Sequence, residues 1–131
     1  MVILGNALFG HIETGGTGKR MAAGPSSDKS AVAVMLDFKN DSRKTIETIV
    51  FFFLPFDAIN HVVLSRAKGW AQAQLKLMGA IQPDEIKRQV YWENVWYSQE
   101  IAAVKLMRID IAYTDGSTES LRDDQIHFDC A

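Results

Sequence analysis

The stretch Thr45–Phe56 places the strongest constraint on the fold, because β-branched and aromatic residues fill most of it. Such residues favour extended strands. Successive side chains of a strand point to opposite faces, so a strand in a simple two-layer sheet shows one apolar and one polar face. At the centre of this stretch both faces are apolar, with Ile49, Phe51 and Phe53 on one side and Val50, Phe52 and Leu54 on the other.

A strand with two apolar faces needs cover on both sides, since a bare one is prone to aggregate. The N-terminal segment Val2–Ile12 is the nearest part of the chain that is apolar enough to supply that cover. A second copy of the chain is the other possibility. In that case Ile49, Phe51 and Phe53 are the predicted residues of an oligomer interface.

Alternation with a period of two continues through most of the chain after residue 30, which predicts further strands. They are expected at Ala31–Lys39, Val62–Ser65, Ala71–Leu77, Ile86–Trp92, Val104–Tyr113 and Thr118–Leu121, with Ile126 and Phe128 in a last short strand. Gly79 and Gln82-Pro83-Asp84 are expected to break strands, and Asp115-Gly116 predicts a type I′ hairpin turn. About seven antiparallel strands at this spacing predict an all-β fold, an immunoglobulin-like β-sandwich.

Small and turn-forming residues dominate the stretch Thr14–Ser27, which predicts a loop or linker. We therefore divide the chain into two parts. Residues 1–30 form an N-terminal apolar segment and a Gly/Ser-rich loop, and residues 31–131 form the sandwich domain. The segment Val2–Ile12 fits either a strand that docks on the sandwich or a short helix. In both cases we expect it to form an N-terminal extension of the sandwich.

The composition excludes several classes of protein. With 47% hydrophobic and 23% charged residues, the 131-residue chain resembles an ordinary globular domain. Its formal net charge of −2 offers no basic surface for nucleic acid. The longest apolar run, Ile49–Leu54, is far shorter than the roughly 20 residues of a membrane-spanning helix. We expect no nucleic-acid binding and no membrane span.

The sequence leaves the cellular compartment open. Cys130 is the only cysteine, so no disulfide can form within the chain and the fold must be held by packing. The apolar N-terminus has no basic leader and is interrupted by Asn6, which makes it a poor signal peptide. The chain fits the cytoplasm or, if a signal has been removed, the cell envelope.

No motif for catalysis, metal binding or cofactor binding is complete. Gly15–Lys19 resembles part of a phosphate-binding loop, but Glu13 and Arg20 occupy positions where that motif needs Gly and Ser or Thr. The three histidines lack the spacing of metal ligands, and no serine or cysteine stands in a nucleophile motif. We predict no catalytic residue, no metal and no cofactor, and therefore no enzyme.

The aromatic residues around Trp92 are the best candidates for a binding site. Alternation places Ile86, Arg88, Val90 and Trp92 on one face, which predicts Trp92 in the core. Tyr91 then lies on the other face. Two more aromatics, Trp96 and Tyr97, are expected in the connection that follows this strand. The predicted partner-binding residues are Tyr91, Trp96, Tyr97 and Trp70, although Trp96 and Trp70 also fit a core position.

Several structural motifs occur in an order that resembles a known family. They are Phe38-Lys39-Asn40-Asp41-Ser42, Pro55-Phe56-Asp57-Ala58, Gly79-Ala80-Ile81-Gln82-Pro83, Trp92-Glu93-Asn94-Val95-Trp96 and Tyr113-Thr114-Asp115-Gly116-Ser117. In this order the chain resembles the bacterial immunoglobulin-like β-sandwich domains of uncharacterised function, including those with a Phe-x-Leu-Tyr-Asp motif. The resemblance covers roughly residues 31 to 121. It implies an immunoglobulin-like fold, often in envelope-associated or multidomain bacterial proteins, and no catalytic residues.

Together these observations predict a non-catalytic interaction module. Its partner is expected to be another protein or a second copy of the chain. The alternative is a module that binds carbohydrate or a small ligand through the exposed aromatic residues.

Overall fold

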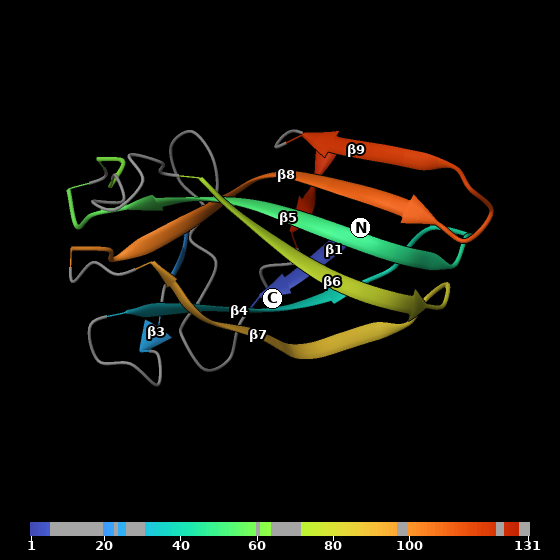
Figure 1. Ribbon diagram of the computed structural model, residues 1–131, viewed down its shortest axis with the longest axis horizontal. Coiled ribbons are helices and arrows are strands. Elements are labelled where there is room, and N and C mark those ends of the chain that lie inside the picture. The colour runs from blue at the N-terminus through green and yellow to red at the C-terminus, as the bar shows by residue number, and fades with distance from the viewer. Residues whose placement is uncertain are drawn as a thin grey trace.

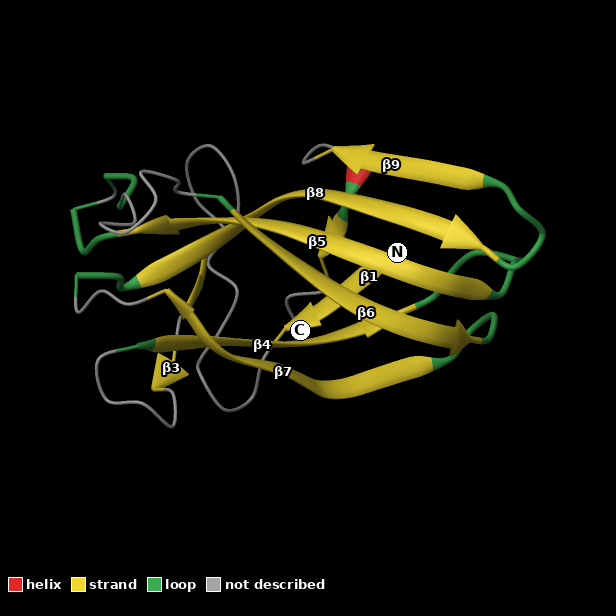
Figure 2. Ribbon diagram, in the orientation of Figure 1, coloured by secondary structure: helices red, strands yellow, loops and turns green. Residues whose placement is uncertain are grey.

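The stretch with two apolar faces forms strand β5 (Ile46–Phe56), which lies inside a five-stranded sheet of the computed structural model (Figures 1 and 2). Its neighbours β8 (Ala103–Tyr113) and β6 (Ala73–Ile81) both run antiparallel to it. Two shorter strands, β2 (Arg20–Ala22) and β9 (Thr118–Arg122), pair with β8 at different points along its length. Among the strands that the structure describes, β6 therefore forms one edge of this sheet.

The second five-stranded sheet is built around β4 (Val32–Lys39). It pairs along most of its length with β7 (Ile86–Trp96) and also with β1 (Val2–Gly5) and β3 (Gly24–Pro25). Strand β10 (His127–Phe128) runs parallel to β1. The structure describes residues 1–5, 20–22, 24–25, 31–59, 61–63, 72–96, 100–122 and 125–128.

The two sheets pack face to face around a shared core, which confirms the prediction of an all-β sandwich. The ring of Phe38 in β4 meets the ring of Phe51 in β5 edge to face, with centroids 5.4 Å apart. Burying a side chain of this size stabilises the fold by roughly 1.5–3 kcal/mol. Aromatic pairs of this geometry add about 0.5–1.5 kcal/mol. The finer assignment to an immunoglobulin-like topology stays a prediction.

Three strands, β1, β2 and β3, lie within the first thirty residues, and they pair with β4 and β8. Strands from both sides of residue 30 therefore share the two sheets. The division of the chain into residues 1–30 and 31–131 stays a prediction. The predicted strand at Val62–Ser65 is described only in part, and there Val62 forms an isolated bridge with Phe56.

Strand β1, the described start of one of the two candidates for covering β5, does not lie on the outer face of β5. Strand β1 belongs to the opposite sheet, and the rest of the segment Val2–Ile12 lies outside the described residues. On the outer face of β5, the Arg108 guanidinium of the neighbouring strand lies 4.9 Å from the centre of the Phe52 ring. The Lys105 ammonium lies 4.6 Å from the centre of the Phe56 ring. Long cationic side chains of β8 thus cover part of this apolar face.

The turn between β8 and β9 differs from the predicted type I′ turn. Within this turn only Gly116 has a positive φ, 88°, whereas a type I′ turn needs positive values at both central residues. The N–H of Gly116 donates to the carbonyl of Tyr113 at 3.0 Å, and the N–H of Tyr113 donates to Ser117 at 2.9 Å. This is the pattern of a type I turn followed by a glycine bulge. Glycine is required here because other residues rarely adopt this backbone conformation.

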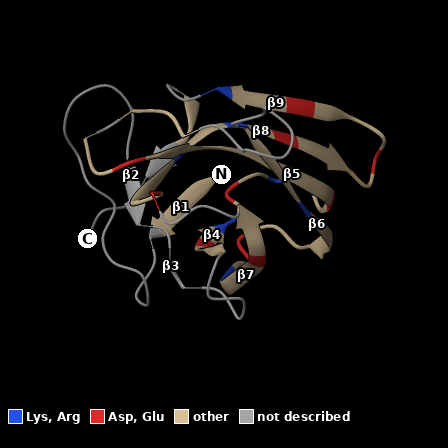
Figure 3. Ribbon diagram, turned by 60° about the vertical axis from the view of Figure 1, so that its left-hand side comes forward, with Lys and Arg blue, Asp and Glu red and all other residues tan. Residues whose placement is uncertain are grey.

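Charged side chains are spread over the sandwich. Figure 3 shows acidic and basic positions interspersed along the strands and turns. Within the described residues, no helix has the length and apolar character needed to cross a membrane.

Candidate functional site

The hairpin of β6 and β7 joins the two sheets, because β6 pairs with β5 whereas β7 pairs with β4. Pro83 and Asp84 form the turn between these strands. Asp84 has a φ of 64°, and the N–H of Glu85 donates to Gln82 at 3.1 Å. Proline followed by a residue of positive φ is typical of a type II turn. Beyond this turn β6 stays paired with β5 and β7 stays paired with β4. The edge of β6 therefore faces the edge of β7 without pairing with it.

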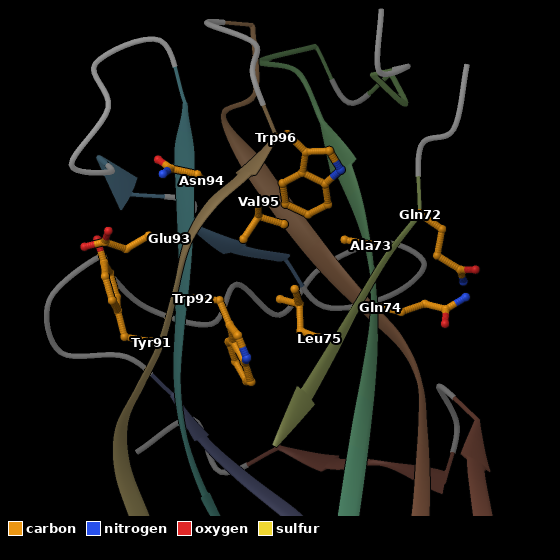
Figure 4. A pocket seen from close by; sticks show the side chains of 10 residues that line it. All are labelled: Gln72, Ala73, Gln74, Leu75, Tyr91, Trp92, Glu93, Asn94, Val95 and Trp96. Atoms are coloured by element: carbon orange, nitrogen blue, oxygen red, sulfur yellow. The ribbon is translucent and has the colours of Figure 1, made fainter. Parts of the chain in front are cut away.

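A cleft of about 560 Å³ lies between these two edges (Figure 4). It is lined by Gln72, Ala73, Gln74, Leu75, Tyr91, Trp92, Glu93, Asn94, Val95 and Trp96. The side chains of Leu75, Trp92 and Val95 lie in the gap between the strands (Figure 4). Tyr91 and Glu93 point to the far side of β7, and the glutamines of the opposite wall point away from the gap. The cleft therefore has an apolar floor between two strand edges.

Trp92 connects the cleft with the core. Its ring packs edge to face against Phe51, with centroids 5.5 Å apart. Its indole N–H donates to the backbone carbonyl of Lys76 in β6 at 3.3 Å. This long hydrogen bond crosses the gap from one sheet to the other. The sequence favoured a core position for Trp92, and its half-buried side chain packs against the core and also lines the cleft.

Two β-bulges shape the cleft wall that β7 forms. The register between β4 and β7 shifts on either side of Val34–Leu36, near Gln89 and Asn94. These two residues have positive φ values of 56° and 53°, which are uncommon for residues other than glycine. The backbone N–H of Gln89 donates to the Asp37 carboxylate at 2.6 Å. A carboxylate thus satisfies a donor that the bulge removes from the ladder.

Two of the four predicted binding residues, Tyr91 and Trp96, line the cleft, although the Tyr91 side chain points to the far side of β7 (Figure 4). Tyr91 is 41% exposed and stands across from Met35 on the outer side of β7. Trp96 is 5% exposed and lies within β7 instead of in the connection after it. The other two, Trp70 and Tyr97, lie outside the described residues. Sequence reasoning missed Leu75, which only the divergence of the two sheets brings beside Trp92.

The predicted interface residues Ile49, Phe51 and Phe53 are fully buried in the core of a single chain. Side chains without exposed surface cannot contact a second copy, so the structure corrects their assignment to an oligomer interface. The sequence predicted two apolar faces of this strand, and the outward face carries Val50, Phe52 and Leu54 instead. These three are half-buried.

A shallow groove of about 290 Å³ lies on the outer face of the same sheet, beside Asp110. Arg108 holds this carboxylate through two bonds of 2.6 and 2.7 Å, and the Ser120 hydroxyl donates to it at 2.7 Å. Burial raises the pKa of Asp110, but the hydrogen bonds from Arg108 and Ser120 outweigh burial and leave this pKa below its ordinary value. Arg108 and Ser120 thus keep the Asp110 carboxylate ionised and fixed in place.

Within the described residues, no group of three or more His, Cys, Asp or Glu side chains is arranged to hold a metal ion. The glycine-rich stretch Gly15–Lys19, as well as His11, falls outside those residues. A comparison of the chain with protein-family models, with curated proteins and with solved structures finds no match. The geometry of the cleft is therefore the basis for a functional proposal.

Proposed function

We propose that the chain is a non-catalytic β-sandwich interaction module that binds a protein partner in the cleft between β6 and β7. The observation that carries this proposal is the apolar floor between two strand edges that belong to different sheets. Apolar side chains offer buried contact area, and strand edges offer backbone hydrogen-bonding groups. Protein segments use both when they bind to sheets.

The family resemblance and the strand order support an immunoglobulin-like module as part of this proposal. In immunoglobulin-like domains the second and fifth strands are neighbours in one sheet, and the third, sixth and seventh share the other. Counting β4 as the second strand makes β7 the fifth, and these two pair here. The third, sixth and seventh are then β5, β8 and β9, which share the opposite sheet. Such domains commonly serve as binding modules, although the fold alone assigns no partner.

Carbohydrate or small-ligand binding is the weaker alternative. Sugars are bound on aromatic platforms, which need several rings exposed on one side. Tyr91 and Trp92 point to opposite sides of β7, and Trp96 is almost fully buried (Figure 4). The aromatic residues that the structure describes therefore form no common platform. The experiments below also test whether a second copy of the chain is the partner, which would give a homodimer.

Selection of peptides tests the proposal. Random peptides of roughly ten residues, long enough to span a strand, would be displayed on phage and selected on the immobilised chain. Selected peptides would be synthesised and their affinities measured by fluorescence anisotropy. We expect Leu75→Asp, which places a charge on the cleft floor, to weaken binding by roughly tenfold or more.

Leu121→Asp is the matched control, because Leu121 is also a half-buried leucine packed on the core but lies on β9, away from the cleft. Circular dichroism would show that both variants are folded. Equal effects of the two variants, or the failure of any peptide to bind, would overturn the proposal. Sedimentation of the chain alone would reveal whether a second copy occupies the cleft.

A further inference from the structure

The two edges of the cleft differ in their ability to pair with another strand. Strand β6 keeps one register with β5 from Ala73 to Met78, and the only shift lies at its other end, beyond Met78. Strand β7 contains the bulges near Gln89 and Asn94. Bulges interrupt the regular spacing of backbone groups and protect an edge from further pairing. The regular edge of β6 is therefore the one that can accept a strand.

The hydrogen bond from Trp92 shows which backbone groups of β6 face the cleft. It ends on the carbonyl of Lys76, so this carbonyl points away from β5. In an antiparallel strand, the N–H and C=O of one residue point to the same side, and alternate residues share that side. Gln74, Lys76 and Met78 consequently present their backbone groups to the cleft. Among the described residues, β6 pairs with no strand on this side.

From this edge we infer that the partner binds as an extended peptide strand added to β6. This inference rests on the proposed function and specifies its mode. The added strand lies about 4.8 Å from β6 and exchanges backbone hydrogen bonds with Gln74 and Lys76. Its alternate side chains contact Leu75 and Trp92 on the apolar floor. The peptide class is therefore an extended segment with apolar residues at every second position.

In the free protein, the indole N–H of Trp92 donates to the Lys76 carbonyl. The added strand needs the same carbonyl as a hydrogen-bond acceptor. A bond of 3.3 Å is longer than the usual 2.9–3.0 Å and is readily exchanged. Lys76 itself is exposed and places a positive charge at the middle of the edge. Charge on an edge strand opposes pairing with a second copy, because two such strands would bring equal charges together. This favours a different protein segment as the occupant.

Two substitutions at one position test the mode of binding. Lys76→Pro removes an N–H that points into the cleft and leaves the ladder with β5 intact, as proline is tolerated on this side of an edge strand. Lys76→Ala removes the side chain and keeps the N–H. With a peptide selected as described above, we expect Lys76→Pro to weaken binding by roughly tenfold and Lys76→Ala by less than about threefold.

Amide hydrogen exchange provides a second measurement that does not depend on the proline variant. Saturation with the selected peptide should slow exchange at the amides of Gln74 and Lys76, while the amide of Thr118 on β9 serves as the control. If Leu75→Asp abolishes binding but the two Lys76 variants bind alike and no amide is protected, strand addition is overturned and the cleft remains the binding site. If no peptide binds, the proposed function fails, and this inference fails with it.

Discussion

The side-chain nitrogen of Asn40 lies 3.1 Å from the carbonyl oxygen of Ile81, which links the loop after β4 to the end of β6. The same nitrogen donates to Lys44 at 2.9 Å, and the side-chain oxygen accepts from the Ser42 hydroxyl at 2.6 Å. The backbone N–H of Asn40 donates to Glu85 at 3.0 Å. One side chain, 1% exposed, thus fixes two loops at the end of the sandwich where the β6–β7 hairpin turns.

Replacing Asn40 with alanine should lower the free energy of unfolding by about 2–3 kcal/mol, because buried carbonyl groups would lose their donor. Urea denaturation followed by tryptophan fluorescence measures the change. Ser42→Ala serves as the control and should cost less than about 1 kcal/mol, since water can replace its more accessible hydroxyl. Equal losses in the two variants would show that Asn40 does not organise this end.

The contributions of the two faces of β5 to stability can be compared by replacing neighbouring phenylalanines. Phe51 is fully buried and contacts Phe38, Phe53 and Trp92, so Phe51→Ala should cost about 3–5 kcal/mol of stability. Phe52 lies on the half-buried outer face, and Phe52→Ala should cost about 1 kcal/mol. Thermal denaturation of both variants measures the difference. A larger loss from Phe52→Ala would contradict the orientation of this strand.

The bulge at Gln89 should depend on the carboxylate of Asp37. Asp37→Ala removes the acceptor of the Gln89 N–H and should cost about 1–3 kcal/mol. Asp37→Asn keeps an acceptor oxygen and should cost less. Hydrogen exchange at the Gln89 amide provides the direct readout, and it should be fast in Asp37→Ala. Unchanged exchange in that variant would mean that another group satisfies this donor.

The β8–β9 turn should contribute to the pH dependence of stability through Asp115. The Ser117 hydroxyl donates to this carboxylate at 2.5 Å, the Ser117 N–H donates at 2.9 Å, and the Lys44 ammonium lies 3.3 Å away. These contacts lower the pKa of Asp115 from 3.8 to about 2. Because the folded-state pKa is the lower one, the stabilisation is complete above the unfolded-state value and is lost as the pH falls towards 2.

Asp115→Asn tests this contribution. The variant should be less stable than the original chain at about pH 5. The difference in unfolding free energy should become smaller at about pH 2.5, where the native carboxylate begins to be protonated. An NMR titration of the Asp115 carboxyl carbon measures the pKa itself. A stability difference that stays constant between these two pH values would exclude the proposed ionic contribution.

The sequence predicted the strands well because alternation is a local signal. For β5 it predicted which side chains share a face, but not which face is buried, since both are equally apolar. It placed a break at Gly79, whereas β6 continues to Ile81. Pairing with β5 extends the strand past this glycine, which is a contribution of tertiary structure that local propensity does not include.

The candidate site was less predictable because it depends on the bulges of β7. Alternation placed Ile86 on the same face as Trp92, yet the bulge at Gln89 changes the phase and leaves Ile86 42% exposed. Gln89 carries no sequence signal for a positive φ, and Asn94, although asparagine tolerates this conformation, lies inside the strand. Trp92 could be predicted to be buried, but its position beside Leu75 depends on how two different sheets diverge.

The pairing of β4 with β7 also affects how the chain folds. The whole β5–β6 hairpin lies between these two strands in the sequence, so their ladder closes a long loop. Closing such a loop costs chain entropy before its contacts can form, and sandwiches of this kind typically fold in milliseconds to seconds. We expect β5 and β6 to associate first and β7 to dock late. Until β7 docks, the edge of β6 is exposed without the indole of Trp92, and the nascent chain is then most open to pairing with a neighbouring molecule.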